Sequence, residues 1–324
     1  MPTTGRLAPS PTGAQHLGNA RTYLLAWLSA RAGGGTVRLR IEDLDTPRNK
    51  PDAVAQLFDD LARLGLDCDG DPVVQSANLA AHAAALDVLK RRDLVYPCTC
   101  TRSDIATAAA APHAEHEGPA YPGTCAYRTA ADAAGLDRPH AWRFRVTHSP
   151  AFVDGFRGPT AIDLTQVGGD FVVWRSYDAP AYQLAVVVDD AAMGVTDVLR
   201  GDDLVPSTPR QLLLYEALGL PAPAFTHVPL VVGADGRRLA KRHGDTRLQT
   251  YWHRGVTPEA VLGTLAWSCG WLEKPDPVTA RDLLPLFTLA TVPRTAWVAD
   301  ETLLVSSQNS TAEEQRSGEV RTQV

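Results

Sequence analysis

The stretch RLAPSPTG at residues 6–13, followed by HLGN at 16–19, predicts the fold of the surrounding chain. This loop, rich in proline and glycine, leads into an apolar segment, YLLAWL at 23–28, which a triple glycine at 33–35 ends. The order is typical of a strand or loop, a helix N-terminus and a helix stop. Because a helix N-terminus exposes unpaired N–H groups and the positive end of its dipole, it can bind phosphate.

Two residues at this junction bear on ligand binding. His16 would add hydrogen-bond donors, and Gly18 would let a ligand approach the backbone closely. The alternative is an ordinary proline-rich loop that caps a core helix, and these residues alone fit both interpretations.

The following residues alternate between strand and helix patterns. Apolar residues alternate with arginine over 37–41, as in a strand that ends at Glu42. Residues 51–64 place their apolar side chains on one helical face before Gly65, and a second helix is expected over 78–92. The alternation predicts a parallel α/β sheet that binds ligands at the carboxyl ends of its strands.

The pattern is interrupted at residues 95–150, which are rich in turns and carry a cysteine cluster, so we expect an insertion there. Three apolar runs then indicate that the α/β pattern resumes, at 171–174, 182–188 and 195–199. On this interpretation Asp189 and Asp190 stand at a strand end, where they either face substrate or have a structural role.

Two further helices are predicted towards the end of the chain. One covers 207–218, with Ser207 as N-cap and Pro209 in its first turn. The other covers 257–271, is capped by Thr257 and belongs to a small helical appendix.

The composition is that of a globular protein with two or more lobes, since 324 residues exceed one typical core. With 44% hydrophobic residues, no run is long enough to span a bilayer, and no secretory signal is visible. A net charge of −6 argues against a generic nucleic-acid binder but allows a local basic patch. The five cysteines fit a reducing compartment. We therefore expect a cytoplasmic enzyme.

Three of the cysteines lie close together in the sequence and suit a tetrahedral zinc site: Cys98, Cys100 and Cys125. The fourth ligand is open at this point, since His113 and His116 lie between them, and three unrelated thiols are the alternative. Cys68 and Cys269 are in apolar helical contexts and are interpreted as core residues.

A second phosphate-binding candidate is GADGRRLAKRHG at 233–244. A turn is predicted at 234–236. The basic residues that follow could neutralise phosphate charge in a transition state, and these are Arg237, Arg238, Lys241 and Arg242. A solvated basic turn is the alternative.

Together these segments resemble the class I aminoacyl-tRNA synthetases. PSPTG with HLGN is similar to their HIGH motif, and RLAKR at 238–242 is similar to their KMSKS loop, with Ala240 in place of serine. Four further motifs narrow the resemblance to glutamyl-tRNA synthetases: IEDLDTPR at 41–48, AYQLAVVVDD at 181–190, GVTDVLRGDDL at 194–204 and TPRQLLLYEALGL at 208–220.

The resemblance covers most of residues 5–290 and implies a Rossmann-like catalytic domain with a zinc-binding insertion and a small C-terminal helical subdomain. The expected parts are the first half of the catalytic domain at 1–94, the insertion at 95–150, the second half at 151–233, the KMSKS-like loop with a helical stem-contact region at 234–305, and a disordered tail at 306–324. The cysteine spacing also matches the family's zinc pattern, in which a tyrosine is the fourth ligand, so the resemblance moves that role to Tyr121. One Zn²⁺ per chain is expected.

The resemblance implies glutamate activation with ATP, with Mg²⁺ accompanying the nucleotide. His16, Gly18 and Lys241 would be catalytic, and Asn19 would join them in binding ATP. Arg6 and Tyr182 would bind the side-chain carboxylate of glutamate, and Arg200 its α-carboxylate. The α-amino group would meet Glu42 and the segment formed by Leu7, Ala8, Pro9 and Ser10. Alternatively, Arg6 and Arg200 form surface ion pairs and Glu42 caps a helix.

About eighty residues follow the KMSKS-like loop, so no long helical anticodon-binding region is expected. In this the chain resembles a truncated branch of the family, which transfers glutamate to the queuosine base in the anticodon of tRNA(Asp). The partners implied are L-glutamate, ATP and that anticodon stem-loop, with no membrane, and a monomer is expected. The alternatives are a short glutamyl-tRNA synthetase that charges the 3′ end of tRNA(Glu), and a non-catalytic zinc-containing tRNA-binding module.

Overall fold

The computed structural model describes residues 2–45, 48–101, 103–105, 120–237, 239 and 246–299. Its α-helices are α1 (Leu17–Arg31), α2 (Ala53–Arg63), α3 (Leu79–Arg91), α5 (Tyr182–Ala192), α6 (Ser207–Leu218), α7 (Leu248–His253) and α8 (Pro258–Ser268). Its strands are β1 (Thr4–Leu7), β2 (Thr36–Ile41), β3 (Val73–Val74), β4 (Val95–Cys98), β5 (Ala141–Phe144), β6 (Phe152–Asp154), β7 (Gly158–Thr160), β8 (Phe171–Arg175), β9 (Ala179–Pro180), β10 (Asp197–Gly201), β11 (Ala224–Val228), β12 (Val231–Val232) and β13 (Trp297–Val298). Within the described ranges, no helix combines the length and apolarity needed to cross a membrane.

Parallel strands form the centre of the molecule. β1 pairs with β2, and β2 pairs with β3, all in parallel register. β10 pairs with β11 in the same way and lies beside β1, where the Thr196 N–H donates to the Thr4 carbonyl at 2.9 Å. The chain thus continues from β1 to β2 on one side of β1, and β10 returns to the other side of β1. In parallel sheets such a reversal creates a crevice at the carboxyl ends of the strands.

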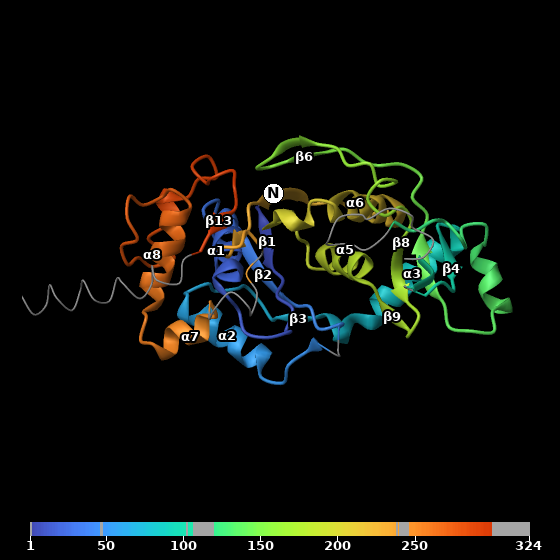
Figure 1. Ribbon diagram of the computed structural model, residues 1–324, viewed down its shortest axis with the longest axis horizontal. Coiled ribbons are helices and arrows are strands. Elements are labelled where there is room, and N and C mark those ends of the chain that lie inside the picture. The colour runs from blue at the N-terminus through green and yellow to red at the C-terminus, as the bar shows by residue number, and fades with distance from the viewer. Residues whose placement is uncertain are drawn as a thin grey trace, which may run out of the picture.

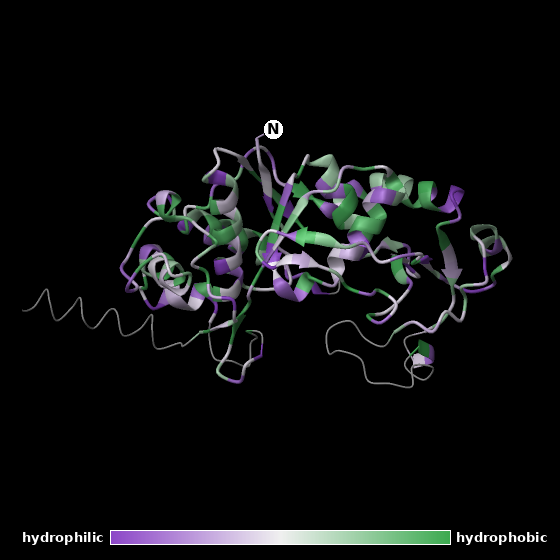
Figure 2. Cartoon of the chain, turned by 90° about the horizontal axis from the view of Figure 1, so that it is seen from above, coloured by the Kyte–Doolittle hydropathy of each residue, from purple (hydrophilic) through white to green (hydrophobic). Residues whose placement is uncertain are grey.

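Hydrophobic cores cover both faces of this sheet, because neighbouring residues along a strand point to opposite faces. In β10, Leu199 belongs to the core built with α1 and α8, whereas Val198 belongs to the core built with α5 and α6. Figure 1 shows these helices on opposite sides of β1 and β2. Figure 2 shows the hydrophobic residues concentrated in these central helices and strands.

A four-stranded antiparallel sheet, in the order β4-β5-β8-β9, forms the far end of the molecule in Figure 1. The strand expected at 171–174 is therefore present as β8, but it pairs with β5 of the cysteine-containing region and not with the parallel sheet. The prediction that it resumes the parallel α/β pattern is wrong, because strand patterning does not specify the pairing partner.

The apolar run at 182–188 is also different from the prediction, since it lies in helix α5. Every residue from Leu184 to Asp190 is buried. A helix buried on all sides has no polar face, so its sequence shows no helical period and its three successive valines favour a strand. Asp189 and Asp190 consequently lie in a helix and not at a strand end.

The remaining helix predictions are confirmed within a few residues. The Thr257 hydroxyl accepts from the Ala260 N–H at 3.2 Å and caps α8, as predicted. Ser207 is the first residue of α6 and not its N-cap, because Pro206 occupies the cap position. The tail predicted at 306–324 lies outside the described residues.

Candidate active site

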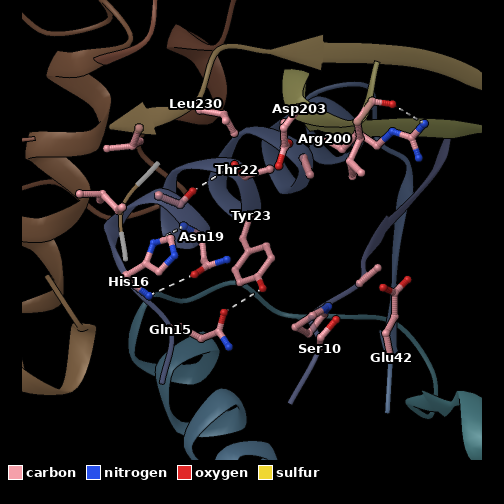
Figure 3. A pocket seen from close by; sticks show the side chains of 18 of the residues that line it. Ser10, Gln15, His16, Asn19, Thr22, Tyr23, Glu42, Arg200, Asp203 and Leu230 are labelled. Atoms are coloured by element: carbon pink, nitrogen blue, oxygen red, sulfur yellow. Dashed lines mark hydrogen bonds between the residues drawn. The ribbon is translucent and has the colours of Figure 1, made fainter. Parts of the chain in front are cut away.

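A cavity of about 540 Å³ lies at the carboxyl ends of β1, β2 and β10. Ten predicted site residues line it: Arg6, Ala8, Pro9, Ser10, His16, Gly18, Asn19, Glu42, Tyr182 and Arg200. Leu7 instead packs in the hydrophobic core. Lys241 lies outside the described residues. Figure 3 shows His16 and Asn19 at one end of the cavity, with Ser10, Glu42 and Arg200 at the other.

The N-terminus of α1 forms one end of the cavity and is held by a reciprocal cap. The Asn19 N–H donates to His16 Nδ1 at 3.4 Å, and the His16 N–H donates to Asn19 Oδ1 at 3.2 Å. This capping box fixes the orientation of the imidazole ring at the cavity wall. The core-capping and ligand-binding interpretations of this segment are therefore compatible.

Gly18 leaves room for the imidazole ring. A Cβ atom built at Gly18 would lie 3.1 Å from two ring atoms of His16 and 3.4 Å from the Cβ of Val231. The absence of a side chain here thus allows the close packing of His16, in addition to any approach of a ligand.

Two arginine side chains at the other end of the cavity are almost fully buried, with Arg6 at 6% and Arg200 at 4% exposure. Arg6 Nη1 donates to the Leu199 carbonyl at 3.2 Å. The Arg200 guanidinium donates through Nε to His227 Nε2 at 3.0 Å and through Nη2 to Thr208 Oγ1 at 2.8 Å. Burial lowers the pKa of Arg200, and Arg6 lowers it further. These arginines do not form surface ion pairs.

Glu42 follows β2 and pairs with Arg40 of the same strand, Oε1 to Nη2 at 3.0 Å. This contact is an ion pair with the same strand and not the helix cap given as the alternative for Glu42. Burial raises the pKa of Glu42, while the guanidinium groups of Arg40 and Arg6 oppose that rise. Arg40 itself is fully buried, and its side chain also forms an ion pair with Asp190. Burial alone would lower the pKa of Arg40, but Asp190 and Glu42 together raise it.

The two aspartates of α5 have different environments. Asp190 Oδ1 contacts Arg40 and lies 3.7 Å from Arg6 Nε, so it supports two cationic residues beside the cavity. Asp189 points to another region, where it accepts hydrogen bonds from Gln75 at 2.8 Å and Asn78 at 2.6 Å.

Tyr182 begins α5 and presents its side chain to the cavity. Burial raises the pKa of its phenol, and the carboxylate of Glu42 raises it further. The hydroxyl group is therefore neutral and able to donate a hydrogen bond.

Several polar residues behind the cavity are absent from the sequence prediction. Arg40 lies in a strand whose arginines alternate with apolar residues, a pattern that indicates a solvent-facing side. Asp154 and His227 come from two separate elements and lie in none of the motifs, whereas Thr208 opens the motif at 208–220 without a role predicted for it. One signal for Arg40 was available, since a parallel strand between two helix layers is buried on both faces.

A second cluster lies at the antiparallel sheet. The sulfur atoms of Cys98, Cys100 and Cys125 all lie within 4.8 Å of one another. The Tyr121 hydroxyl lies 3.4 Å from Cys98 Sγ, and the sulfur atoms of Cys100 and Cys125 are 3.7 Å apart. Tetrahedral zinc with its usual bond lengths separates two sulfur ligands by about 3.8 Å and a sulfur from an oxygen by about 3.5 Å.

The remaining candidates come from the predicted basic loop at 233–244 and from the cysteines and histidines outside the Cys98–Cys100–Cys125 cluster. The turn predicted at 234–236 is confirmed by a hydrogen bond from the Gly236 N–H to the Gly233 carbonyl at 2.9 Å. Cys269 is buried in the core, as expected. Cys68 is only partly buried against that core and lies in coil after α2, so its prediction as a core residue in a helical context is wrong. His113, His116, Arg238 and Arg242 lie outside the described residues.

Residues 3–306 match the family described as tRNA synthetases class I (E and Q), catalytic domain. The chain is 48% identical to the glutamyl-Q tRNA(Asp) synthetase of Rhodopirellula baltica over 90% of this chain and 93% of that protein. It is 41% identical to the glutamate–tRNA ligase of Geobacter sulfurreducens, over 90% of this chain and 62% of that protein.

Among solved structures, the chain is similar to a glutamate tRNA ligase from Elizabethkingia meningosepticum in complex with its amino acid. The TM-score is 0.79 at 27% identity, over 94% of this chain and 68% of that one. The expected α/β catalytic fold is thereby confirmed.

Proposed function

Because the chain belongs to the class I tRNA synthetases for glutamate and glutamine, we propose that it activates L-glutamate with ATP and transfers it to queuosine in tRNA(Asp). Relatives named for this activity are 48% and 49% identical and are covered over 93% and 94% of their length. Of the glutamate–tRNA ligase from Geobacter sulfurreducens the chain covers only 62%. The proposed substrates place the activity in the cytoplasm.

One observation carries the amino-acid specificity, namely the match in charge between the cavity and glutamate. Glutamate has two carboxylates and one ammonium group. The cavity presents two buried arginines for the carboxylates, and the partly buried carboxylates of Glu42 and Asp203 also line it. Arg6 with Tyr182 would bind the side-chain carboxylate, and Arg200 the α-carboxylate. A guanidinium group with little access to water makes strong, oriented hydrogen bonds to a carboxylate.

The ammonium group of glutamate would meet Glu42 and the backbone after β1. Ala8, Pro9 and Ser10 line the same end of the cavity as Glu42. The Glu42 N–H is already bonded to the Pro9 carbonyl at 2.9 Å, which holds the loop and the strand end together.

The nucleotide would lie at the other end, against the N-terminus of α1. His16, Gly18 and Asn19 line that end, and the helix dipole favours phosphate there. Lys241 would approach from the KMSKS-like loop and neutralise charge on the phosphates, together with Mg²⁺.

In the first step, an α-carboxylate oxygen of glutamate attacks the α-phosphorus of ATP. A new O–P bond forms, the bond to the β-phosphate oxygen breaks, and pyrophosphate leaves. In the second step, the acceptor group of queuosine attacks the acyl carbon of glutamyl-adenylate and AMP leaves. No covalent intermediate with the protein is needed, so catalysis depends on positioning and on charge stabilisation.

Cys98, Cys100, Tyr121 and Cys125 would hold one Zn²⁺, because their ligand atoms have the separations of a tetrahedral site. Zinc there would cross-link the start of the inserted segment to residues 121–125. Arg143 supports an anionic ligand set, since its Nε lies 3.4 Å from Cys98 Sγ and its guanidinium carbon lies 3.8 Å from the centre of the Tyr121 ring.

ATP–pyrophosphate exchange tests the activation step. The wild-type protein is expected to exchange label only when glutamate is present, and Arg6→Met should abolish this exchange. Arg63→Met is the control, because Arg63 is half exposed and lies outside the cavity, where it forms an ion pair with Asp59 and lies over the Trp252 ring. Absence of exchange by the zinc-loaded wild-type protein would favour a non-catalytic tRNA-binding module.

A further inference from the structure

Behind Arg200 lies a buried chain of polar side chains that has no direct part in the proposed reaction. Asp154 Oδ2 lies 2.5 Å from His227 Nδ1, and His227 Nε2 accepts from Arg200 Nε at 3.0 Å. The side chains of Asp154 and His227 are both fully buried. Thr208 Oγ1 accepts from Arg200 Nη2 and lies 3.2 Å from His227 Nε2. His227 and Thr208 thus hold two of the three guanidinium nitrogens of Arg200, Nε and Nη2.

The carboxylate at the start of this chain is rigidly placed. Asp154 ends β6, and its Oδ1 accepts hydrogen bonds from the backbone N–H groups of Phe156 at 2.9 Å, Arg157 at 2.8 Å and His227 at 3.2 Å. The next residue, Gly155, donates to the Phe225 carbonyl at 2.8 Å, which docks the β6–β7 ribbon on β11. Figure 1 shows this ribbon crossing above the central sheet.

The donors and acceptors determine the form of the imidazole. Since Arg200 Nε–H can only donate, His227 Nε2 must carry a lone pair, and the ring proton lies on Nδ1, facing Asp154. Although burial alone would raise it, hydrogen bonds from His227 and three backbone N–H groups lower the pKa of Asp154 to about 2. Burial lowers the pKa of His227 below 6.5, and Arg200 adds to that effect against the opposing influence of Asp154. The pair is therefore a carboxylate and a neutral imidazole.

We propose that Asp154 and His227 are positioning residues that fix the guanidinium plane of Arg200, so that Nη1 is presented to the α-carboxylate of glutamate. This inference rests on the proposed function. Arg200 lines the cavity, and among the described residues its buried Nη1 has no hydrogen-bond partner. Because the other two nitrogens are held from behind, Nη1 is the donor left for a ligand.

The arrangement makes glutamate binding sensitive to acid. A protonated His227 would place an N–H group against the N–H of Arg200 and break their hydrogen bond. The polar groups that face His227 are Asp154 of β6, Arg200 of β10 and Thr208 of α6, with Arg157 nearby. Since the pKa of His227 lies below its ordinary value, the KM for glutamate should be constant from pH 6.5 to 8 and rise at lower pH.

Substitutions at His227 test the role by separating the acceptor from the volume of the ring. His227→Phe keeps a ring but removes the acceptor, whereas His227→Gln offers a side-chain oxygen to Arg200 Nε. In glutamate-dependent ATP–pyrophosphate exchange, His227→Phe should raise the KM for glutamate about ten- to a hundredfold and leave the KM for ATP within about twofold. His227→Gln should recover most of this loss.

The matched control is the other buried aspartate–histidine pair, His82 with Asp189, whose Nε2 and Oδ1 lie 2.9 Å apart. His82→Gln should lower stability without raising the KM for glutamate. An unchanged KM for glutamate in folded His227→Phe, or equal increases in both KM values, would overturn the proposal.

A spectroscopic measurement tests the same inference without activity. In ¹⁵N-histidine NMR spectra of the wild-type protein, His227 should be the neutral tautomer protonated at Nδ1 at pH 7.5. A His227 ring protonated at Nε2 would contradict the proposal. If the wild-type protein shows no glutamate-dependent exchange, the proposed function fails and Arg200 loses its assigned ligand, whereas the tautomer still reports whether Asp154 and His227 orient the guanidinium.

Discussion

Replacing Asp190 by asparagine should both destabilise the protein and weaken glutamate binding. Asp190 forms an ion pair with Arg40, whose side chain has no exposed surface, and its Oδ1 lies 3.7 Å from Arg6 Nε. Removing one partner of a buried ion pair typically costs 3–5 kcal/mol, because it leaves a buried charge without compensation. Glu42 remains 3.0 Å from Arg40, so we expect the lower end, about 3 kcal/mol.

The effect on binding follows from the same contacts. Without Asp190, Glu42 becomes the principal carboxylate beside Arg40 and is less available to the ammonium group of the substrate. Loss of about one charged hydrogen bond corresponds to roughly a tenfold rise in the KM for glutamate. The KM for ATP should change little, because the nucleotide is proposed to bind at the opposite end of the cavity.

Urea unfolding and ATP–pyrophosphate exchange measure the two effects. Asp59→Asn is the matched control, since Asp59 and Arg63 form an ion pair at 2.8 Å in which both side chains are about half exposed. Such a pair contributes only about 0–1 kcal/mol. If Asp190→Asn and Asp59→Asn cost the same free energy of unfolding, the buried ion pair of Asp190 and Arg40 does not stabilise the protein more than an exposed pair does.

Three further predictions concern metal, packing and pH. The wild-type protein should contain one zinc per chain by elemental analysis, and Cys98→Ser with Cys100→Ser should abolish it while Cys68→Ser retains it; a zinc-free wild-type protein would contradict the site. Gly18→Ala should displace the ring of His16 and weaken ATP binding by about 1 kcal/mol, roughly fivefold, whereas Gly135→Ala, with nothing near its added Cβ, should not. Burial raises the pKa of Asp60 from 3.8 to about 6. Because Asp60 ionises at lower pH in the unfolded protein than in the folded one, its contribution to stability should fall as pH rises from about 4 to 6. In urea unfolding, Asp60→Asn should therefore be more stable than wild type at pH 7, with no gain at pH 3.5. A gain that persists at pH 3.5 would exclude this cause.

The parts of the fold that the sequence predicts well are those with a polar face or a defined end. Helix α1 starts after a capping sequence and stops before three glycines, and α2 has a clear apolar face, so both were predicted within a few residues. Helix α5 has no polar face, and β8 pairs with a strand nearly thirty residues earlier. Neither property is encoded in local periodicity.

The same distinction applies to the site. Arg6, Glu42 and Arg200 follow from motifs at strand ends, and the structure brings them to one cavity. Arg40 and His227 were missed, because their importance comes from partners far away in sequence. His227 meets Asp154 across 73 positions, and Arg40 meets Asp190 across 150. Only the tertiary structure reveals such contacts.

The activity proposed for this protein is the activation of glutamate and its transfer to queuosine in tRNA(Asp). Its most direct test is the incorporation of labelled glutamate into purified tRNA(Asp) with and without queuosine, with tRNA(Glu) as a parallel substrate. We expect incorporation only into tRNA(Asp) that contains queuosine. Glutamate attached to tRNA(Glu), with none on queuosine-containing tRNA(Asp), would contradict it and identify a short glutamyl-tRNA synthetase.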